Sequence, residues 1–232
     1  MRKFCGLLMK TLFLPLCLIL AVACSAPTPV SGQFASDTFT DTDATLLQDH
    51  VPDIGGAWTK ARGTTDMVIN SNHVFSTASA ALTYYVPNTS STTNDVDVQA
   101  DFYWDGTGTD TTPCIVGRAS EVQTTAYAVR HDVVAVVWQL RRYLNSTTGV
   151  QIGFYGGDSP TTVRTVKLQM RGDQLSVYID GVLRIGPITD ANIVSGKAGV
   201  GVAGAGPDHY WLDNFKATTT KYPTKSGGMM LP

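Results

Sequence analysis

Glutamate is almost absent from this sequence: Glu121 is the only one among its 232 residues, and lysine is also scarce. Both residue types are strong helix formers, so their shortage excludes a helix bundle or a coiled coil as the main body. With 17 basic and 19 acidic side chains, the chain also lacks the positive excess of a strongly basic nucleic-acid binder, and no nucleic-acid partner is expected. What remains is rich in threonine, glycine and short apolar runs, which favours an all-β domain.

Cysteine is too rare to supply a disulfide framework. Of the four cysteines, Cys5, Cys17 and Cys24 lie at the N-terminus, which leaves Cys114 alone in the rest of the chain. Cys114 lies in an apolar stretch with no histidine near it in sequence, so a buried structural thiol is favoured over a nucleophile. About 200 residues bury enough surface to form one domain without disulfides.

The first 24 residues have the pattern of a signal peptide. Arg2 and Lys3 precede an apolar stretch over residues 11–22, which small residues follow. This stretch is shorter than the roughly 20 apolar residues of a membrane span, and Pro15 interrupts it, so a permanent transmembrane helix is disfavoured. Export is therefore expected.

Leu20-Ala21-Val22-Ala23, directly before Cys24, resembles the lipobox of bacterial lipoproteins. That resemblance implies lipidation of Cys24, a membrane contact made only through the lipid, and anchoring at the outer membrane or the cell surface. Secretion after cleavage at Ala23 is the alternative. The chain is thus divided into a signal peptide (1–24), a flexible tether (25–33), a folded domain (34–217) and a disordered tail (218–232).

From Ser36 onward, short alternating runs broken by turn residues predict an antiparallel two-sheet sandwich. The clearest strand spans residues 95–105, with Asp97, Gln99, Asp101 and Tyr103 on its solvent-facing side. Residues 133–144 are more uniformly apolar, which predicts a central strand. The segments 162–170, 175–180 and 182–185 predict a meander whose turns are residues 171–174 and Asp180-Gly181. In the last strand, residues 210–217, strict alternation places Trp211, Asp213, Phe215 and Ala217 on one face.

Several short pieces together resemble the concanavalin A-like lectin and glucanase superfamily, in its laminin-G type of jelly roll. They are, in chain order, Asp37-Thr38-Phe39, Gly56-Ala57-Trp58, Gly117-Arg118, the run from Leu175 to Gly181, and Asp213-Asn214-Phe215. The resemblance covers roughly residues 34–217 and implies a jelly-roll sandwich of two antiparallel sheets whose first and last strands lie side by side. Members bind or cleave polysaccharides or serve as adhesive modules, so the fold does not choose among these functions.

Catalysis has little support in the sequence. Retaining glucanases of this superfamily carry paired glutamates on one strand, and Glu121 has no carboxylate two or four residues later. Asp97 and Asp101 share a strand face but lie about 13 Å apart by strand rise. A polysaccharide lyase would need Arg, Gln, His and Tyr converging on one sheet, for which Arg118, Gln139, His131 and Tyr127 supply only the residue types.

The leading hypothesis is a non-catalytic, lectin-like module that binds extracellular polysaccharide. Sugar rings stack on aromatic side chains, while arginine bonds their hydroxyl groups. The candidate ligand-binding residues are Tyr103, Arg118, Tyr127, Arg130, Trp138 and Arg141. The alternatives are a polysaccharide hydrolase or lyase on the same fold, and a structural or adhesive protein of a cell surface or virion.

Two interpretations are open for Asp37 and Asp213: ligands of a structural calcium ion, or aspartates that form or end turns without any cofactor. Jelly rolls of the superfamily often hold a structural calcium beside the first and last strands, and aspartate is a hard oxygen ligand. The resemblance makes Asp37 and Asp213 the candidate calcium ligands. The four histidines are isolated in sequence, so a zinc site is not expected.

Overall fold

The computed structural model describes residues 30–221, apart from residues 79, 90, 92, 108–109 and 206–208. The expected signal peptide, its Cys24 and residues 222–232 lie outside the described residues. Within the described part the chain forms sixteen β-strands and one short 3-10 helix, η1 (Leu47–Asp49). No helix in that part is both long enough and apolar enough to span a lipid bilayer.

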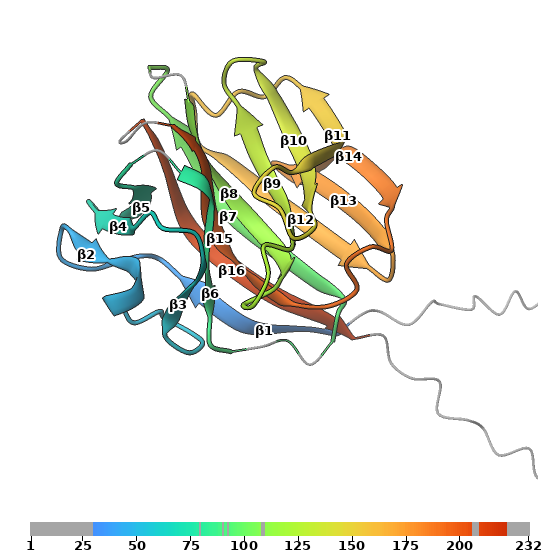
Figure 1. Ribbon diagram of the computed structural model, residues 1–232, viewed down its shortest axis with the longest axis horizontal. Coiled ribbons are helices and arrows are strands. Elements are labelled where there is room, and N and C mark those ends of the chain that lie inside the picture. The colour runs from blue at the N-terminus through green and yellow to red at the C-terminus, as the bar shows by residue number, and fades with distance from the viewer. Residues whose placement is uncertain are drawn as a thin grey trace, which may run out of the picture.

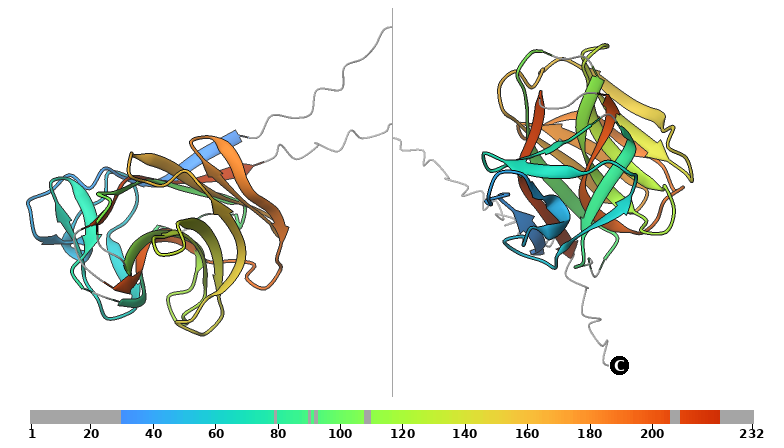
Figure 2. Two further views of the ribbon diagram at one scale, coloured as in Figure 1. Left: turned by 90° about the horizontal axis from the view of Figure 1, so that it is seen from above. Right: turned by 60° about the vertical axis from the view of Figure 1, so that its left-hand side comes forward.

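The strands form two antiparallel sheets that face one another (Figure 1, Figure 2). Sheet A contains β1 (Val30–Asp37), β2 (Thr45–Leu46), β4 (Met67–Asn70), β5 (His73–Ser76), β7 (Val96–Trp104), β12 (Arg164–Arg171), β13 (Gln174–Ile179), β14 (Val182–Thr189) and β16 (Tyr210–Lys221). Sheet B contains β3 (Trp58–Arg62), β6 (Ala80–Pro87), β8 (Asp110–Ala119), β9 (Ala126–Asp132), β10 (Val137–Tyr143), β11 (Val150–Gly156) and β15 (Lys197–Ala205). The expected all-β sandwich is confirmed.

The first and last strands lie side by side, as expected (Figure 1). β1 pairs antiparallel with β16, with Val30 opposite Lys221 and Asp37 opposite Phe215. The pairing corrects the predicted domain ends, because residues 30–33 and 218–221 belong to strands and not to a tether or a tail. Residues 218–220 are all threonine, a residue that favours strands.

The facing sides of the sheets form one apolar core. Val98, Ala100 and Phe102 of β7 point into it at every second position, which confirms the expected period. Phe102 meets Trp138 of sheet B edge-on, with ring centroids 5.4 Å apart. Nearer the paired terminal strands, the ring of Trp58 packs against Phe215, with centroids 5.2 Å apart. Aromatic contacts therefore hold the layers together at both places.

The meander of β12, β13 and β14 is confirmed. Its second turn has Asp180 at φ 50° and Gly181 at φ 78°, the pair of positive values that a two-residue hairpin of this type requires. Cys114 is fully buried, as expected, and burial raises the pKa of its thiol to about 12. The thiol therefore has no nucleophilic thiolate near neutral pH.

Two strand predictions are wrong. Residues 133–136 form the turn between β9 and β10, where Val134 is 75% exposed, and β10 lies next to the edge strand β11 and not at the centre. The Asp132 carboxylate accepts hydrogen bonds from the backbone N–H groups of Val134 and Ala135, which fixes the turn despite its apolar composition.

The second error concerns β16. A bulge between Asp213 and Lys216, with Asn214 at φ 52°, reverses the alternation within the strand. Phe215 and Ala217 consequently lie in the core, whereas Trp211 and Asp213 lie on the outer face of sheet A and are partly exposed.

Candidate functional site

Two of the six candidate ligand residues lie inside the core. Tyr127 and Trp138 are fully buried between the sheets. The Tyr127 hydroxyl donates to Asp190 at 2.8 Å and accepts from the Ile193 N–H at 3.2 Å, and burial raises its pKa to about 12. The predictions for Tyr127 and Trp138 are wrong because their strand positions point these large side chains inward.

Arg118 lines a cavity of about 310 Å³ beside Asp95 and Asp173, but its guanidinium is committed to the protein's own backbone. Its side chain is 2% exposed, and its guanidinium donates to three backbone carbonyls: Ile193 at 2.8 Å, Gly172 at 2.6 Å and Asn94 at 3.2 Å. These carbonyls belong to three separate connections between strands. Arg118 therefore fixes loops to one another, and its assignment as a ligand residue is wrong.

Arg130 and Arg141 lie together on the outer face of sheet B. Both guanidinium groups donate to Oε1 of Gln139, Arg130 through Nε at 3.2 Å and Arg141 through Nη1 at 2.9 Å. The Gln139 amide donates in turn to Asp132, whose carboxylate also lies 3.6 Å from Arg130. The side-chain amide of Gln139 thus orients two positively charged guanidinium groups on the same face of the sheet.

The surrounding surface, called the arginine face here, follows the strand register across sheet B. In order across the strands, one row contains Phe154, Gln139, Arg130, Cys114, Gly201, Tyr84 and Arg62. A Cβ atom on Gly201 would lie 2.5 Å from the Thr83 carbonyl oxygen, so only glycine allows β15 and β6 to approach this closely. Cys114, Gly201 and Tyr84 of this row are buried, and the Arg130 guanidinium reaches across the row to the Ala203 carbonyl at 3.4 Å.

The exposed groups of the arginine face suit a polar ligand with apolar ring faces. Phe154 stands beside Gln139 with 64% of its surface exposed. Arg62 and Arg141 form no ion pair with any carboxylate in the described part of the chain, and each has a buried Nε that lacks a hydrogen-bond partner there. The sequence prediction named Arg130 and Arg141 and did not include Phe154, which lies in an edge strand with no clear apolar alternation.

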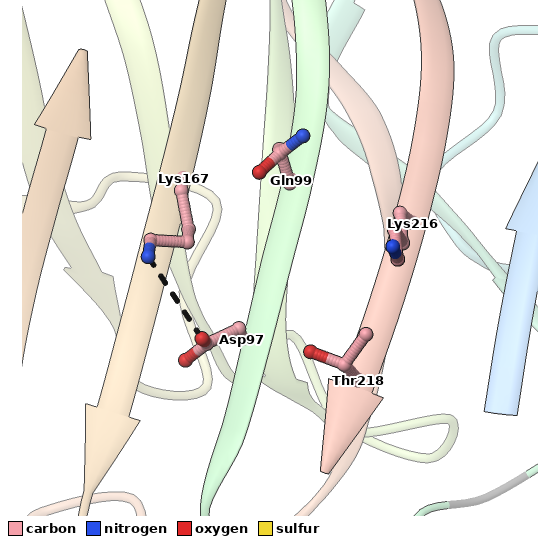
Figure 3. Close-up of a pocket in the computed structure, with 5 residues that line it drawn as sticks. All are labelled: Asp97, Gln99, Lys167, Lys216 and Thr218. Carbon is pink, nitrogen blue, oxygen red and sulfur yellow. Dashed lines mark ion pairs between the residues drawn. The ribbon is translucent and has the colours of Figure 1, made fainter. Parts of the chain in front are cut away.

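Tyr103 lies on the opposite side of the molecule, on the outer face of sheet A. It stacks on Trp211, with ring centroids 5.0 Å apart. Farther along the same strands is a shallow pocket of about 180 Å³ lined by Asp97, Gln99, Lys167, Lys216 and Thr218 (Figure 3). The structure therefore does not bring Tyr103 together with the arginines.

Asp37 and Asp213 do not form a calcium site. The Asp37 carboxylate is buried and accepts hydrogen bonds from the Phe39 N–H at 2.7 Å and the Trp58 indole at 2.6 Å, and it contacts the His50 ring nitrogen at 2.9 Å. Across the described residues, no group of three or more His, Cys, Asp or Glu side chains could hold a metal ion. Hydrogen-bond donors surround Asp37, which makes it a structural acceptor and corrects the expectation of a cation ligand.

The residue sets considered for catalysis do not converge. Glu121 lies in the loop after β8 and pairs with Lys197 at 2.9 Å, with 42% of its side chain exposed. Of the lyase-type set, Arg118 fixes loops and Tyr127 and His131 face the core, while Gln139 alone lies on an outer face. Neither set places its members around one substrate.

No protein-family model matches the sequence, and no curated protein does either. Solved structures do resemble the fold. The carbohydrate-binding module CBM66 from Bacillus subtilis shares 16% identity at a TM-score of 0.54, over 71% of this chain and 96% of that one. The exoplasmic/lumenal domain of VIP36 with bound Ca²⁺ and mannose shares 10% identity at a TM-score of 0.51, over 76% and 92%.

LamA from Z. galactanivorans, in complex with laminaritriose and laminaritetraose, shares 10% identity at a TM-score of 0.50, over 84% of this chain and 100% of that one. At these identities the comparisons establish the architecture and not the ligand. The chain therefore has the concanavalin A-like lectin and glucanase fold, which carbohydrate-binding modules, lectins and glucanases share.

Proposed function

We propose that this protein is a polysaccharide-binding, non-catalytic module and that the arginine face of sheet B contacts the ligand. The observation that carries the proposal is the convergence of Arg130 and Arg141 on Gln139 beside the exposed ring of Phe154. Guanidinium groups bond hydroxyl or carboxylate oxygens in pairs, and an aromatic ring packs against the CH face of a sugar. The carbohydrate ligands named for the structural neighbours support this class of ligand.

An acidic polysaccharide fits this face best. Arg62 and Arg141 lack carboxylate partners in the described residues, and Asp132 is the one carboxylate that approaches Arg130. A uronate or sulfate group would supply a negatively charged partner for these arginines, and it would accept two hydrogen bonds from one guanidinium group. Because these groups are partly exposed, binding should weaken as the salt concentration rises.

The test is affinity electrophoresis of the protein in gels that contain alginate or polygalacturonate. Arg141→Ala and Arg130→Ala should each weaken retardation at least about tenfold, because each removes charge-assisted hydrogen bonds worth about 1.5–3 kcal/mol. Arg164→Ala is the matched control, since Arg164 belongs to β12 of sheet A, pairs with Asp180 and should leave affinity unchanged. A wild-type chain that no acidic polysaccharide retards, or equal losses in all three variants, would contradict the proposal.

The same panel separates binding from cleavage. Incubation with each polysaccharide should release no reducing ends and generate no unsaturated uronate absorbance. Appearance of either signal would assign the protein to the hydrolase or lyase alternative.

Export and surface anchoring form the second part of the proposal. The sequence pattern of residues 1–24 supports it, and an anchored position would present the domain to extracellular polysaccharide. Mass spectrometry of the membrane fraction from an expressing bacterium should find an acylated N-terminal peptide that begins at Cys24. A Cys24→Ser variant should be released or left unprocessed. An unmodified peptide beginning after Ala23 would favour plain secretion.

A further inference from the structure

The outer face of sheet A has a row of aromatic side chains, on the opposite side of the sandwich from the arginine face. Trp211 of β16 lies between Tyr103 of β7, with centroids 5.0 Å apart, and His73 of β5, with centroids 4.0 Å apart. All three side chains are partly exposed. Three rings from three neighbouring strands thus form one continuous surface, called the aromatic row here, and hydrophobic burial does not explain why it faces outward.

Carboxylates flank the aromatic row on the same face. Asp101 and Asp213 lie directly opposite one another in the register of β7 and β16, two residues along from Tyr103 and Trp211. Like charges at directly opposed positions destabilise a sheet, so this pair is unfavourable for the fold alone. Such a local conflict is typical of a site kept for function.

The β16 bulge adds an amide to these carboxylates. With Asn214 in the left-handed region at φ 52°, its side-chain NH₂ donates to Asp101 at 2.9 Å. The Thr165 hydroxyl donates to the other oxygen of Asp101 at 2.6 Å, so this carboxylate is held in one orientation. Asp213 accepts from the Asn214 backbone N–H at 2.7 Å, and burial raises its pKa. Bulges often re-aim side chains in this way beside binding sites.

The polar surface continues along the same two strands into the shallow pocket of Figure 3. The side chains of Gln99 and Lys216 lie next beyond the carboxylates, and those of Asp97 and Thr218 beyond them. From Tyr103 to Asp97 the strand spans about 20 Å. The surface is therefore long enough for several linked sugars, and it offers both donors and acceptors along its length.

We propose that this face of sheet A is a second binding surface, whose ligand is a neutral polysaccharide. Because Trp211 and Tyr103 stack on one another, the row presents its ring edges to the ligand, and sugar rings pack against these edges. Their hydroxyl groups bond to Asp101, Asp213 and Asn214. The carboxylates of this face (Asp97, Asp101 and Asp213) are balanced by cations on the same face (Lys167, Lys216 and Arg171). A face with balanced charge suits an uncharged chain, whereas the arginine face suits an acidic one. Because the two surfaces lie on opposite sides of the sandwich, one molecule can connect two different polysaccharides.

The experiment uses the full chain in affinity gels containing laminarin, galactomannan or levan, with alginate gels run in parallel. Trp211→Ala and Tyr103→Ala should each weaken retardation by at least one neutral polysaccharide about tenfold or more and leave alginate retardation unchanged. Trp211→Tyr retains a ring and should keep most of the affinity. Phe154→Ala is the matched aromatic control on sheet B, and it should leave neutral-polysaccharide retardation unchanged.

The outcomes separate this proposal from the function assigned to the arginine face. No retardation of the wild type in any neutral gel, or unchanged retardation of a folded Trp211→Ala variant, overturns the second surface and leaves the first intact. If Arg141→Ala abolishes retardation in the neutral gels, the neutral polysaccharide binds to sheet B. That result also overturns the second surface. Light scattering gives the remaining outcome: a dimer that Trp211→Ala dissociates would assign this surface to a second copy of the chain.

Discussion

Replacing Arg118 with methionine will lower the free energy of unfolding by about 3 kcal/mol, although the residue touches no ligand. Methionine retains most of the side-chain length but cannot donate to the carbonyls of Asn94, Gly172 and Ile193. The bond to Ile193 is buried, so that carbonyl loses its partner without gaining water. Hydrogen bonds from charged donors contribute about 1.5–3 kcal/mol each, and an unpaired buried carbonyl costs about 1–3 kcal/mol.

Urea denaturation of matched variants measures this loss. Arg164→Met is the control, because Arg164 pairs with Asp180 at 2.9 Å while 29% and 41% of the two side chains are exposed. Such a surface pair contributes about 0–1 kcal/mol. Arg118→Lys, which keeps the charge on a single ammonium group, should fall between the two. Equal small losses for Arg118→Met and Arg164→Met would show that the loops hold together without the guanidinium.

Acidification will destabilise the domain through His131. This ring is fully buried and packs against Trp138, with centroids 5.1 Å apart, and its Nε2 has no hydrogen-bond partner in the described residues. Burial lowers its pKa from 6.5 to about 4. Below pH 6.5 His131 therefore binds a proton in the unfolded chain before it does so in the folded chain. The free energy of unfolding consequently decreases as the pH is lowered. The His131 contribution to this loss is about 2 kcal/mol at pH 5 and about 3 kcal/mol at pH 4.

The measurement is urea denaturation of the wild type and His131→Gln at several pH values between 4 and 8. The variant should lack the His131 contribution to the loss of stability at low pH. Its free energy of unfolding should therefore depend less steeply on pH than that of the wild type. Tyr210→Phe is the control: it removes the hydroxyl 3.2 Å from Nδ1 but keeps the imidazole, so the steep dependence should remain. His50 and Asp37, which contact each other elsewhere in the domain, have raised pKa values and act in the opposite direction. The difference between variants is therefore the decisive quantity. Parallel curves for His131→Gln and the wild type would show that the imidazole is not the cause.

The fold could be predicted because its strongest signals are local. The alternation in β7 and the Asp180-Gly181 turn each specify their own backbone conformation without help from distant residues. The bulge in β16 could not be foreseen, because one extra residue reverses the alternation without changing composition. It places Phe215 in the core and Trp211 on the outer face, although simple alternation puts both on one face. Trp211 is not among the ligand residues predicted from the sequence.

The candidate site was predicted less well for a related reason. In β9, apolar residues occur on both faces, because Ala126 and Ala128 share the outer face with Arg130, so apolar periodicity alone does not distinguish Arg130 from Tyr127, which fills the core. Arg118 illustrates a different limit. A guanidinium that binds backbone carbonyls leaves no signature in sequence, because its partners are carbonyls that any residue type could supply.

The pairing of Val30 with Lys221 determines how this domain can be connected to anything else. Both ends of the described chain leave from one corner, only a strand spacing apart. A linker of a few residues could join these ends, so new termini could be opened in an exposed turn such as that at Gly181. The same corner would let the domain be inserted into a host protein through a single narrow stalk, with both broad faces of the sandwich left uncovered.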